Sequence, residues 1–451
     1  MIRRSPIAGA VVVLGAASLV LAACGGSSSS GESSSSASSS SESSSSSSSS
    51  SSAEPTPEPT SDCKNTQLKI GTLLPATGDL AFLGPPEYAG VDLAVMDIDA
   101  AGGVLGQPVV NEYGDSGDTK TDLASQTVDS HLSKGVQVII GAASSGVSLT
   151  VIDKITSNGV LQISPANTAP TLTEYPDNGL YFRTAPSDVL QGAVIAGIAS
   201  GLGLTSGATI AREDPYGVGL QDAFVKDFEN SGGTITVKLT YDPAAPDFAA
   251  EVAEIKASNP EFVQVIGFEE TTKLLQEMIK QGVGPQDVQI FLVDGNISTT
   301  AYKDFPAGTM VGVIASVPTG DPSVDVDAFN NRLLEADPAL TDFAYGAQSY
   351  DATILVALAA DYAGCADGTA IAAAMPMVAN ADAGGEQCMS YADCLAIIQA
   401  GGQPNYDGVT GPLDFNEYGD PKAATIDVVE YTSNTKFKSI EVVGPVEVPV
   451  P

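Results

Sequence analysis

Two polar turns in this sequence carry hydroxyl groups that could bind a small anion. The first, Ala142 to Gly146, follows the apolar run Val136–Ile140, and the second, Ser164 to Thr168, follows the apolar run Val160–Ile163. Both runs are short, as buried parallel strands are, and the first is markedly β-branched. Because ligands of open α/β sheets bind outside the carboxyl ends of the strands, we expect both turns to lie at one binding edge.

A helical pattern follows the first turn, with Val147, Val151, Ile152 and Ile155 on one face. A helix that begins beside Ser145 directs unpaired N–H groups and its positive dipole end at the same edge. The chemistry predicted there is binding of a small anion such as a carboxylate. A structural role stays open, in which Ser145 only caps the helix and Thr168 is only a loop residue.

Composition narrows the classes of function. The chain has 451 residues, enough for two or three domains, and 43% of them are hydrophobic. It has 19 Lys and Arg against 55 Asp and Glu, a net charge of −36, which argues against nucleic acid or anionic lipid as partners. The single histidine, His131, removes most general-base, triad and zinc chemistry, so we expect no metal and no cofactor.

The N-terminus has the pattern of an export signal. Arg3 and Arg4 precede an apolar run, and Leu21-Ala22-Ala23-Cys24 resembles the lipobox of bacterial lipoproteins. This resemblance implies a signal peptide at 1–23, lipidation of Cys24, and a protein anchored by lipid to the outer face of the bacterial cell membrane. An ordinary secretory signal is the alternative. Residues 24–62 are rich in serine, with a few glutamates and a Pro/Glu/Thr patch at 54–60, which predicts a disordered tether.

The remaining chain alternates short apolar runs with helical patterns. Strands are expected at 68–74, 109–113, 136–140 and 160–163, with helices between them. After a pause near Tyr181 to Pro186 the same rhythm restarts and continues to Val317. This order predicts an α/β fold with two Rossmann-like, doubly wound lobes and a cleft between them.

Four cysteines remain after Cys24, and an oxidising compartment favours disulfides between them. Three pairings are possible. We expect Cys388 to pair with Cys394 as a local clamp, and Cys63 to pair with Cys365 as a tie between the first strand and the later helices. A zinc site is the weaker alternative, because no histidine lies near.

Several segments together resemble the leucine/isoleucine/valine-type substrate-binding proteins of ABC importers. They are LKIGTLLPATG from Leu68, AGVDLA from Ala89, VIIG from Val138, PYGVG from Pro215 and DGVTGPLDF from Asp407. The resemblance implies a type I periplasmic-binding fold with a three-segment hinge. One lobe would comprise 66–186 and 317–425, and the other 187–316 and 426–445.

The resemblance also implies the function and partners of the chain. Such a protein binds an amino acid or related small dipolar solute between its lobes, performs no chemistry on it, and delivers it to ABC permease subunits. We expect it to act as a monomer. A ligand-binding module of a sensory system, acting through a partner protein, is the alternative, and a surface hydrolase is a third, disfavoured by the missing histidine partner.

Carried over residue by residue, the resemblance assigns ligand-binding roles to seven positions. The solute carboxylate would meet one lobe, while an aromatic cover, an aromatic wall and an acid for the solute ammonium come from the other. These residues are Ser145, Ala166, Asn167 and Thr168 in the first lobe, and Tyr216, Phe268 and Asp294 in the second.

The second-lobe positions also have structural alternatives. Tyr216 could simply pack at a helix start, Asp294 could be a surface turn residue, and Glu269 and Glu270 are expected to form a solvated helix start. The chain departs from the family at Leu83, where an aromatic residue is expected, so the identity of the solute is left open.

Overall fold

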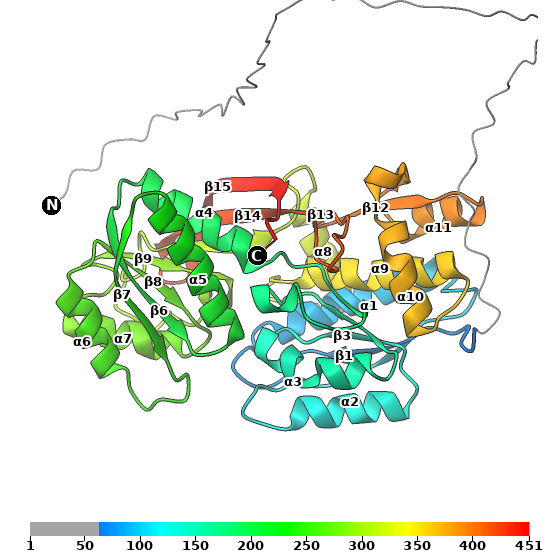
Figure 1. The fold of residues 1–451 in the computed structure, drawn as a ribbon, viewed down its shortest axis with the longest axis horizontal. Coiled ribbons are helices and arrows are strands. Elements are labelled where there is room, and N and C mark those ends of the chain that lie inside the picture. The colour runs from blue at the N-terminus through cyan, green and yellow to red at the C-terminus, as the bar shows by residue number, and fades with distance from the viewer. Residues whose placement is uncertain (1–62, 451) are drawn as a thin grey trace, which may run out of the picture. The chain divides into compact units, whose positions relative to one another are not determined.

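The structure, a computed structural model, describes residues 63–450. The predictions for the signal peptide, the lipidation of Cys24 and the serine-rich tether therefore lie outside the described residues. The expected α/β architecture is confirmed, with two doubly wound sheets, each covered by helices (Figure 1).

The first lobe is built on a five-stranded parallel sheet of order β2-β1-β3-β4-β5. Its strands are β1 Lys69–Leu73, β2 Val110–Glu112, β3 Val138–Gly141, β4 Leu161–Ser164 and β5 Tyr181–Arg183. Its early helices are α1 Gly84–Ala100, α2 Leu123–Ser133 and α3 Ser145–Thr156.

Later segments complete the first lobe. Helix α9, Gly346–Ala363, is buried over most of its length and packs against α1. Around it lie α8 Val326–Ala336, α10 Gly368–Val378, α11 Tyr391–Gln399 and a small sheet of β11 Glu386–Cys388, β12 Pro404–Gly408 and β13 Gly411–Pro412. Sequence patterns did not predict α10 or the small sheet.

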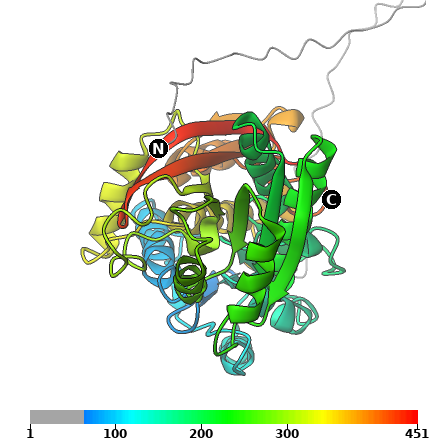
Figure 2. The same ribbon diagram turned by 90° about the vertical axis from the view of Figure 1, so that its left-hand side faces the viewer.

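The second lobe has a seven-stranded sheet of order β15-β14-β10-β9-β8-β6-β7. Strands β14 and β15 lie side by side and antiparallel, in red in Figures 1 and 2. The strands are β6 Ser206–Arg212, β7 Thr234–Tyr241, β8 Phe262–Ile266, β9 Gln289–Leu292, β10 Ile314–Thr319, β14 Ala423–Ser433 and β15 Lys436–Glu447; the helices are α4 Asp188–Gly201, α5 Pro215–Asn230, α6 Ala249–Ser258 and α7 Thr271–Gln281.

The chain passes between the lobes three times, after β5, β10 and β13. This number of crossovers matches the expected three-segment hinge, while the exact lobe boundaries stay a prediction. At the first crossover, Arg183 is fully buried and binds Asp420 of the third crossover through two hydrogen bonds of 2.6 Å. A buried bidentate pair of this kind fixes the two segments against each other.

Both expected disulfides are present. Cys63 pairs with Cys365, just beyond α9, and Cys388 at the end of β11 pairs with Cys394 of α11. His131 has a structural role, since it is buried and its Nε2 lies 2.8 Å from the carbonyl oxygen of Thr72.

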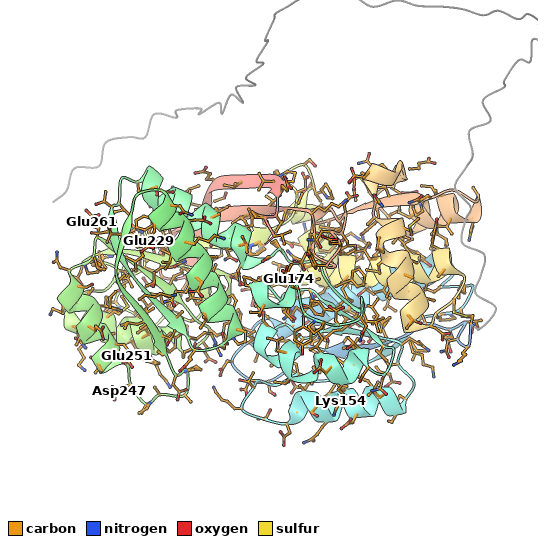
Figure 3. All side chains as sticks on the ribbon, in the orientation of Figure 1. Lys154, Glu174, Glu229, Asp247, Glu251 and Glu261 are labelled. Atoms are coloured by element: carbon orange, nitrogen blue, oxygen red, sulfur yellow. A yellow bond between two sulfur atoms is a disulfide. The ribbon has the colours of Figure 1, made fainter. Side chains whose placement is uncertain are left out.

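Among the described residues, no single helix is long and apolar enough to cross a membrane. Helices α9 and α10 pass that test only as a pair bent by 102°, and most of α9 is buried in the first lobe. Acidic side chains, such as Glu229, Asp247 and Glu261, are exposed on the second lobe (Figure 3).

Glu87 is an unusual member of the first-lobe core. It lies on α1 where this helix packs against α9, it is fully buried, and neither carboxylate oxygen has a hydrogen-bond partner. Burial raises its pKa well above the usual value. The folded state therefore holds a proton that the unfolded chain releases near pH ~4.3.

Stability should consequently fall as pH rises above ~4.3, by up to ~1.4 kcal/mol per pH unit while folded Glu87 keeps its proton. Glu87→Gln should remove this contribution, so that its free energy of unfolding exceeds that of the wild type increasingly with pH. Urea titrations from pH 4 to 8 measure this, with exposed Glu254→Gln as the control. Parallel curves for Glu87→Gln and the wild type would contradict the assignment.

A second prediction concerns the hinge pair. Asp420→Asn should lower the free energy of unfolding by about 3–5 kcal/mol, because it leaves the buried Arg183 guanidinium without its charge partner. Asp382→Asn, which breaks the exposed pair with Lys422 nearby, should change stability little. Equal effects of the two variants in chemical denaturation would show that the hinge pair has no special weight.

Candidate functional site

The first polar turn ends β3 and begins α3. Gly141 has a positive φ of 124°, and a Cβ atom there would lie 2.1 Å from the carbonyl oxygen of Leu73, so only glycine fits. Ser144 caps the helix, since its Oγ accepts from the backbone N–H of Val147. Ser145 is therefore not the cap but the first helical residue, and its Oγ accepts from the N–H of Ala169 at 3.3 Å.

The second polar turn is tied to the first by Ser164. Its Oγ donates to the carbonyl of Ala142 and accepts from the N–H groups of Ala166 and Asn167. The Asn167 side chain donates to two carbonyls of the first turn and accepts from the Tyr181 hydroxyl. It is thus fully engaged inside the lobe and holds the turns together.

The acid of the second lobe is Asp294, which follows β9 and is 6% exposed. Its Oδ1 accepts from Gln191 Nε2 and the Tyr216 hydroxyl, both at 2.9 Å, and its Oδ2 accepts from the Tyr345 hydroxyl at 2.7 Å. Burial raises the pKa of Asp294, and these three hydrogen bonds hold part of that rise back. Asp294 is therefore a buried acid rather than a surface turn residue.

Aromatic rings form the second-lobe wall. Tyr216 and Phe268 stack with their centroids 5.2 Å apart, and the Arg212 guanidinium lies 3.6 Å from the centroid of Phe268. Arg212 in turn pairs with Glu270 at 3.0 Å. The Glu270 side chain is only 8% exposed because it pairs with Arg212, so the expectation that it is solvated was wrong. Glu269 is exposed, as expected.

One small cavity, of about 10 Å³, gathers most of these residues. Five of the seven predicted residues line it, while Asn167 and Thr168 do not. Its lining consists of Leu80, Leu83, Ala143, Ser144, Ser145, Ala166 and Tyr345 from the first lobe, and Tyr216, Phe268, Asp294 and Gly295 from the second. Ser145 and Asp294 thus face a shared cavity from opposite lobes.

Two larger grooves adjoin the cavity. One, of about 330 Å³, shares Asp294 and Tyr345 with it, and the other, of about 350 Å³, shares Phe268 and Gly295. Phe82 lines both grooves. The cavity itself has room for about one water molecule, and the two grooves offer more room beside it.

Tyr345 is the main residue that sequence reasoning missed. It lies between two helices of the first lobe with a positive φ of 60°, and its hydroxyl reaches Asp294 across the cleft. No local sequence pattern marks such a position, and Tyr345 lies far along the chain from most of the other site residues. A second link between the lobes joins Arg212 to Asp79 at 3.6 Å.

The site contains an acid, hydroxyl groups and the N-terminal end of α3. His131 is bound to Thr72 inside the first lobe and does not line the cavity. The arrangement can hold a positive group against Asp294 and a negative group at the α3 end, where unpaired N–H groups favour anions.

Comparison with known sequences gives a match over most of the chain. The family model described as "Periplasmic binding protein" matches residues 67–425. Leu/Ile/Val-binding protein homolog 1 of Brucella abortus is 29% identical over 313 residues, which cover 68% of this chain and 81% of the relative. Homolog 3 of Brucella melitensis is 31% identical, but the match covers 52% of this chain and 63% of that relative, less than two thirds of its length.

Solved structures show the same fold. A leucine-binding protein of Thermotoga maritima superimposes with a TM-score of 0.69 at 22% identity, and the match covers 84% of this chain and 99% of that protein. A solute-binding protein of an ABC transporter from R. palustris, in complex with 4-hydroxybenzoate, has a TM-score of 0.69 at 16% identity. The match covers 85% of this chain and 98% of that protein. Together with the two-lobed architecture and the family match over residues 67–425, these findings identify the chain as a member of the periplasmic binding protein family, with the type I fold.

Proposed function

We propose that this protein is the extracytoplasmic solute receptor of an ABC importer and that it binds an α-amino acid between its lobes. The observation that carries the proposal is the placement of Asp294 and the N-terminal end of α3 on opposite sides of one cavity. An amino acid carries a positive and a negative group on one carbon, so it can bridge these two features. Binding then holds the lobes together.

The chemistry of the lining favours an amino acid over a simple aromatic acid. The R. palustris neighbour is in complex with 4-hydroxybenzoate, which has a carboxylate but no ammonium. Here the buried Asp294 would face such a ligand without a cation to pair with, which is costly. The Brucella relatives are named Leu/Ile/Val-binding proteins, which agrees with an ammonium-bearing solute.

The contacts available at the site can account for micromolar affinity. Hydrogen bonds to charged groups contribute roughly 1.5–3 kcal/mol each. Three or four of them, with aliphatic burial at about 25 cal/mol per Å², can reach the approximately −8 kcal/mol of micromolar binding.

Entry of the solute requires the lobes to move apart. The cavity of about 10 Å³ has room for about one water molecule, whereas an amino acid is several times larger. Two polar links, Tyr345 to Asp294 and Asp79 to Arg212, close it together with apolar contacts between the lobes. We infer that they open to admit the solute and that the three crossovers act as the hinge.

The remaining parts of the proposal concern location and partners. The lipobox-like segment ending at Cys24 would anchor the chain by lipid to the outer face of the membrane, and residues 24–62 would tether it. The solute would pass unchanged to permease subunits. We propose a monomer that performs no catalysis.

Calorimetric titration with amino acids tests this function. The wild type should bind at least one α-amino acid, and Asp294→Asn and Ser145→Ala should each weaken binding by about 10- to 100-fold, since each removes a hydrogen bond to a charged group. Exposed Asp247→Asn serves as the control. Binding of aromatic carboxylates in place of every amino acid would overturn the proposal.

The interlobe hydrogen bond supplies a further prediction. Tyr345→Phe should increase the radius of gyration of the unliganded protein in small-angle scattering and weaken amino-acid binding about tenfold. Tyr406→Phe is the matched control, because its hydroxyl also donates to a buried carboxylate, Asp351, but within the first lobe. It should lower stability and leave both measurements unchanged. An unaltered radius and affinity for Tyr345→Phe would refute the link.

A further inference from the structure

The segment PYGVG, which begins at Pro215, contains two glycines whose role is not yet explained. Both lie in the first two turns of helix α5 of the second lobe. Glycine is a poor helix former, because it loses more backbone freedom on folding than alanine does. Two glycines so close together at the start of a helix therefore call for an explanation in the packing around them.

The first of them, Gly217, makes room for Arg212. A Cβ atom at Gly217 would lie 2.3 Å from the carbonyl oxygen of Arg212 and 2.6 Å from its Cγ. Arg212 can thus pack against the start of α5, with its side chain only 5% exposed. From there its guanidinium reaches Asp79 of the first lobe at 3.6 Å. Gly217 therefore serves one of the contacts between the lobes.

The second, Gly219, makes room for the first lobe itself. A Cβ atom at Gly219 would lie 2.7 Å from Cδ of Pro170, which begins the short helix Pro170–Leu172 of the first lobe. Real Cβ atoms essentially never approach another heavy atom within 3.0 Å. With any larger residue at position 219, α5 and Pro170 would therefore have to move apart.

Pro170 is poorly able to yield to such a collision. Its Cδ is bonded to the backbone nitrogen, so this atom moves only with the main chain. The preceding residue, Ala169, is fully buried, and its N–H donates to Ser145 Oγ at 3.3 Å. The carbonyl of Ala169 accepts from Arg183 of the hinge pair at 3.0 Å. The first-lobe side of the contact is thus held by both the hinge and the polar turns.

The start of α5 faces the first lobe at a further point. A Cβ atom on Gly146, the second residue of α3, would lie 3.8 Å from Cδ of Pro215, an ordinary van der Waals distance. Neither Pro215 nor the pair of Gly219 and Pro170 lines the small interlobe cavity. The lobes therefore also meet beside the candidate site, through residues that do not belong to it.

We propose that the contact between Gly219 and Pro170 limits how far the lobes close, so that Gly219 sets how tightly the cleft grips its solute. This inference rests on the proposed function and adds to it a positioning residue outside the solute site. A methyl group at position 219 would hold the lobes further apart. The solute would then lose part of its contact with one lobe or the other.

Alanine distinguishes this role from an ordinary structural one. Because alanine favours a helix over glycine, Gly219→Ala should keep or raise thermal stability while it impairs closure. Gly197→Ala is the matched control. Gly197 is exposed on α4 of the same lobe, and nothing lies within 4 Å of the Cβ atom it would gain.

The experiment compares the wild type, Gly219→Ala, Gly197→Ala, Pro170→Ala and the double variant of Gly219→Ala with Pro170→Ala. Small-angle scattering measures the radius of gyration of each, alone and with L-leucine. Stopped-flow fluorescence measures the association and dissociation rates of L-leucine. The double variant is a test of rescue, because alanine at position 170 has no Cδ for the new methyl group to meet.

Gly219→Ala should have a larger radius of gyration than the wild type and bind L-leucine about 10- to 100-fold more weakly. The loss should lie in faster dissociation, since the open form that admits the solute is unchanged. The double variant should regain most of the affinity, with Pro170→Ala as its reference, and Gly197→Ala should match the wild type.

Two failures are distinguishable. If the wild type binds no amino acid, the proposed function fails, and the radii of gyration of the wild type and Gly219→Ala then decide this inference by themselves. If Gly219→Ala, with normal circular dichroism, keeps the radius and affinity of the wild type, the contact does not limit closure. Equal losses in Gly219→Ala and the double variant would also overturn the inference, because Pro170 would then have no part in the effect.

Discussion

The carboxylate of Asp294 is the interaction on which the cleft depends. It accepts hydrogen bonds from Gln191 and Tyr216 of its own lobe and from Tyr345 of the other. Without these donors, a charge that is 94% buried would be costly to keep. The same acid thus orders an aromatic wall, joins the two lobes and supplies the negative end of a dipolar site. A solute ammonium would compete with these three donors for the Asp294 carboxylate, which they already hold in position.

If the lobes move apart as we propose, the three crossover segments must stay fixed against one another. The buried pair of Arg183 and Asp420 meets this need, because it joins the first crossover to the third, and Thr173 adds a hydrogen bond to each partner. A comparable device holds the loop after β12, where the Asp351 carboxylate accepts from the N–H groups of Val409 and Thr410. A Cβ atom at Gly408 would collide with that carboxylate, which explains the glycine in the Asp407-Gly408-Val409-Thr410 segment.

Much of this fold could be predicted from the sequence, because short β-branched runs alternate with helical patterns through both lobes. The turns at Ser145 and Ala166 and the acid at Asp294 follow strands directly, so their place at a sheet edge was foreseeable. Tyr345 was not, since it reaches the site only through the packing of α9. The burial of Asp188 was equally hidden: Ser187-Asp188 looks like an ordinary helix start, yet Asp188 is fully buried in the structure.

The Cys63–Cys365 bond has a mechanical consequence. It fastens the first described residue to the segment that follows α9, so a pull on the N-terminal end of the chain is transmitted through sulfur into the first lobe rather than along β1. The second lobe is not part of this connection. If the chain is held to a surface by its N-terminus and the lobes part as we propose, the first lobe would be the fixed base and the second lobe the part that moves.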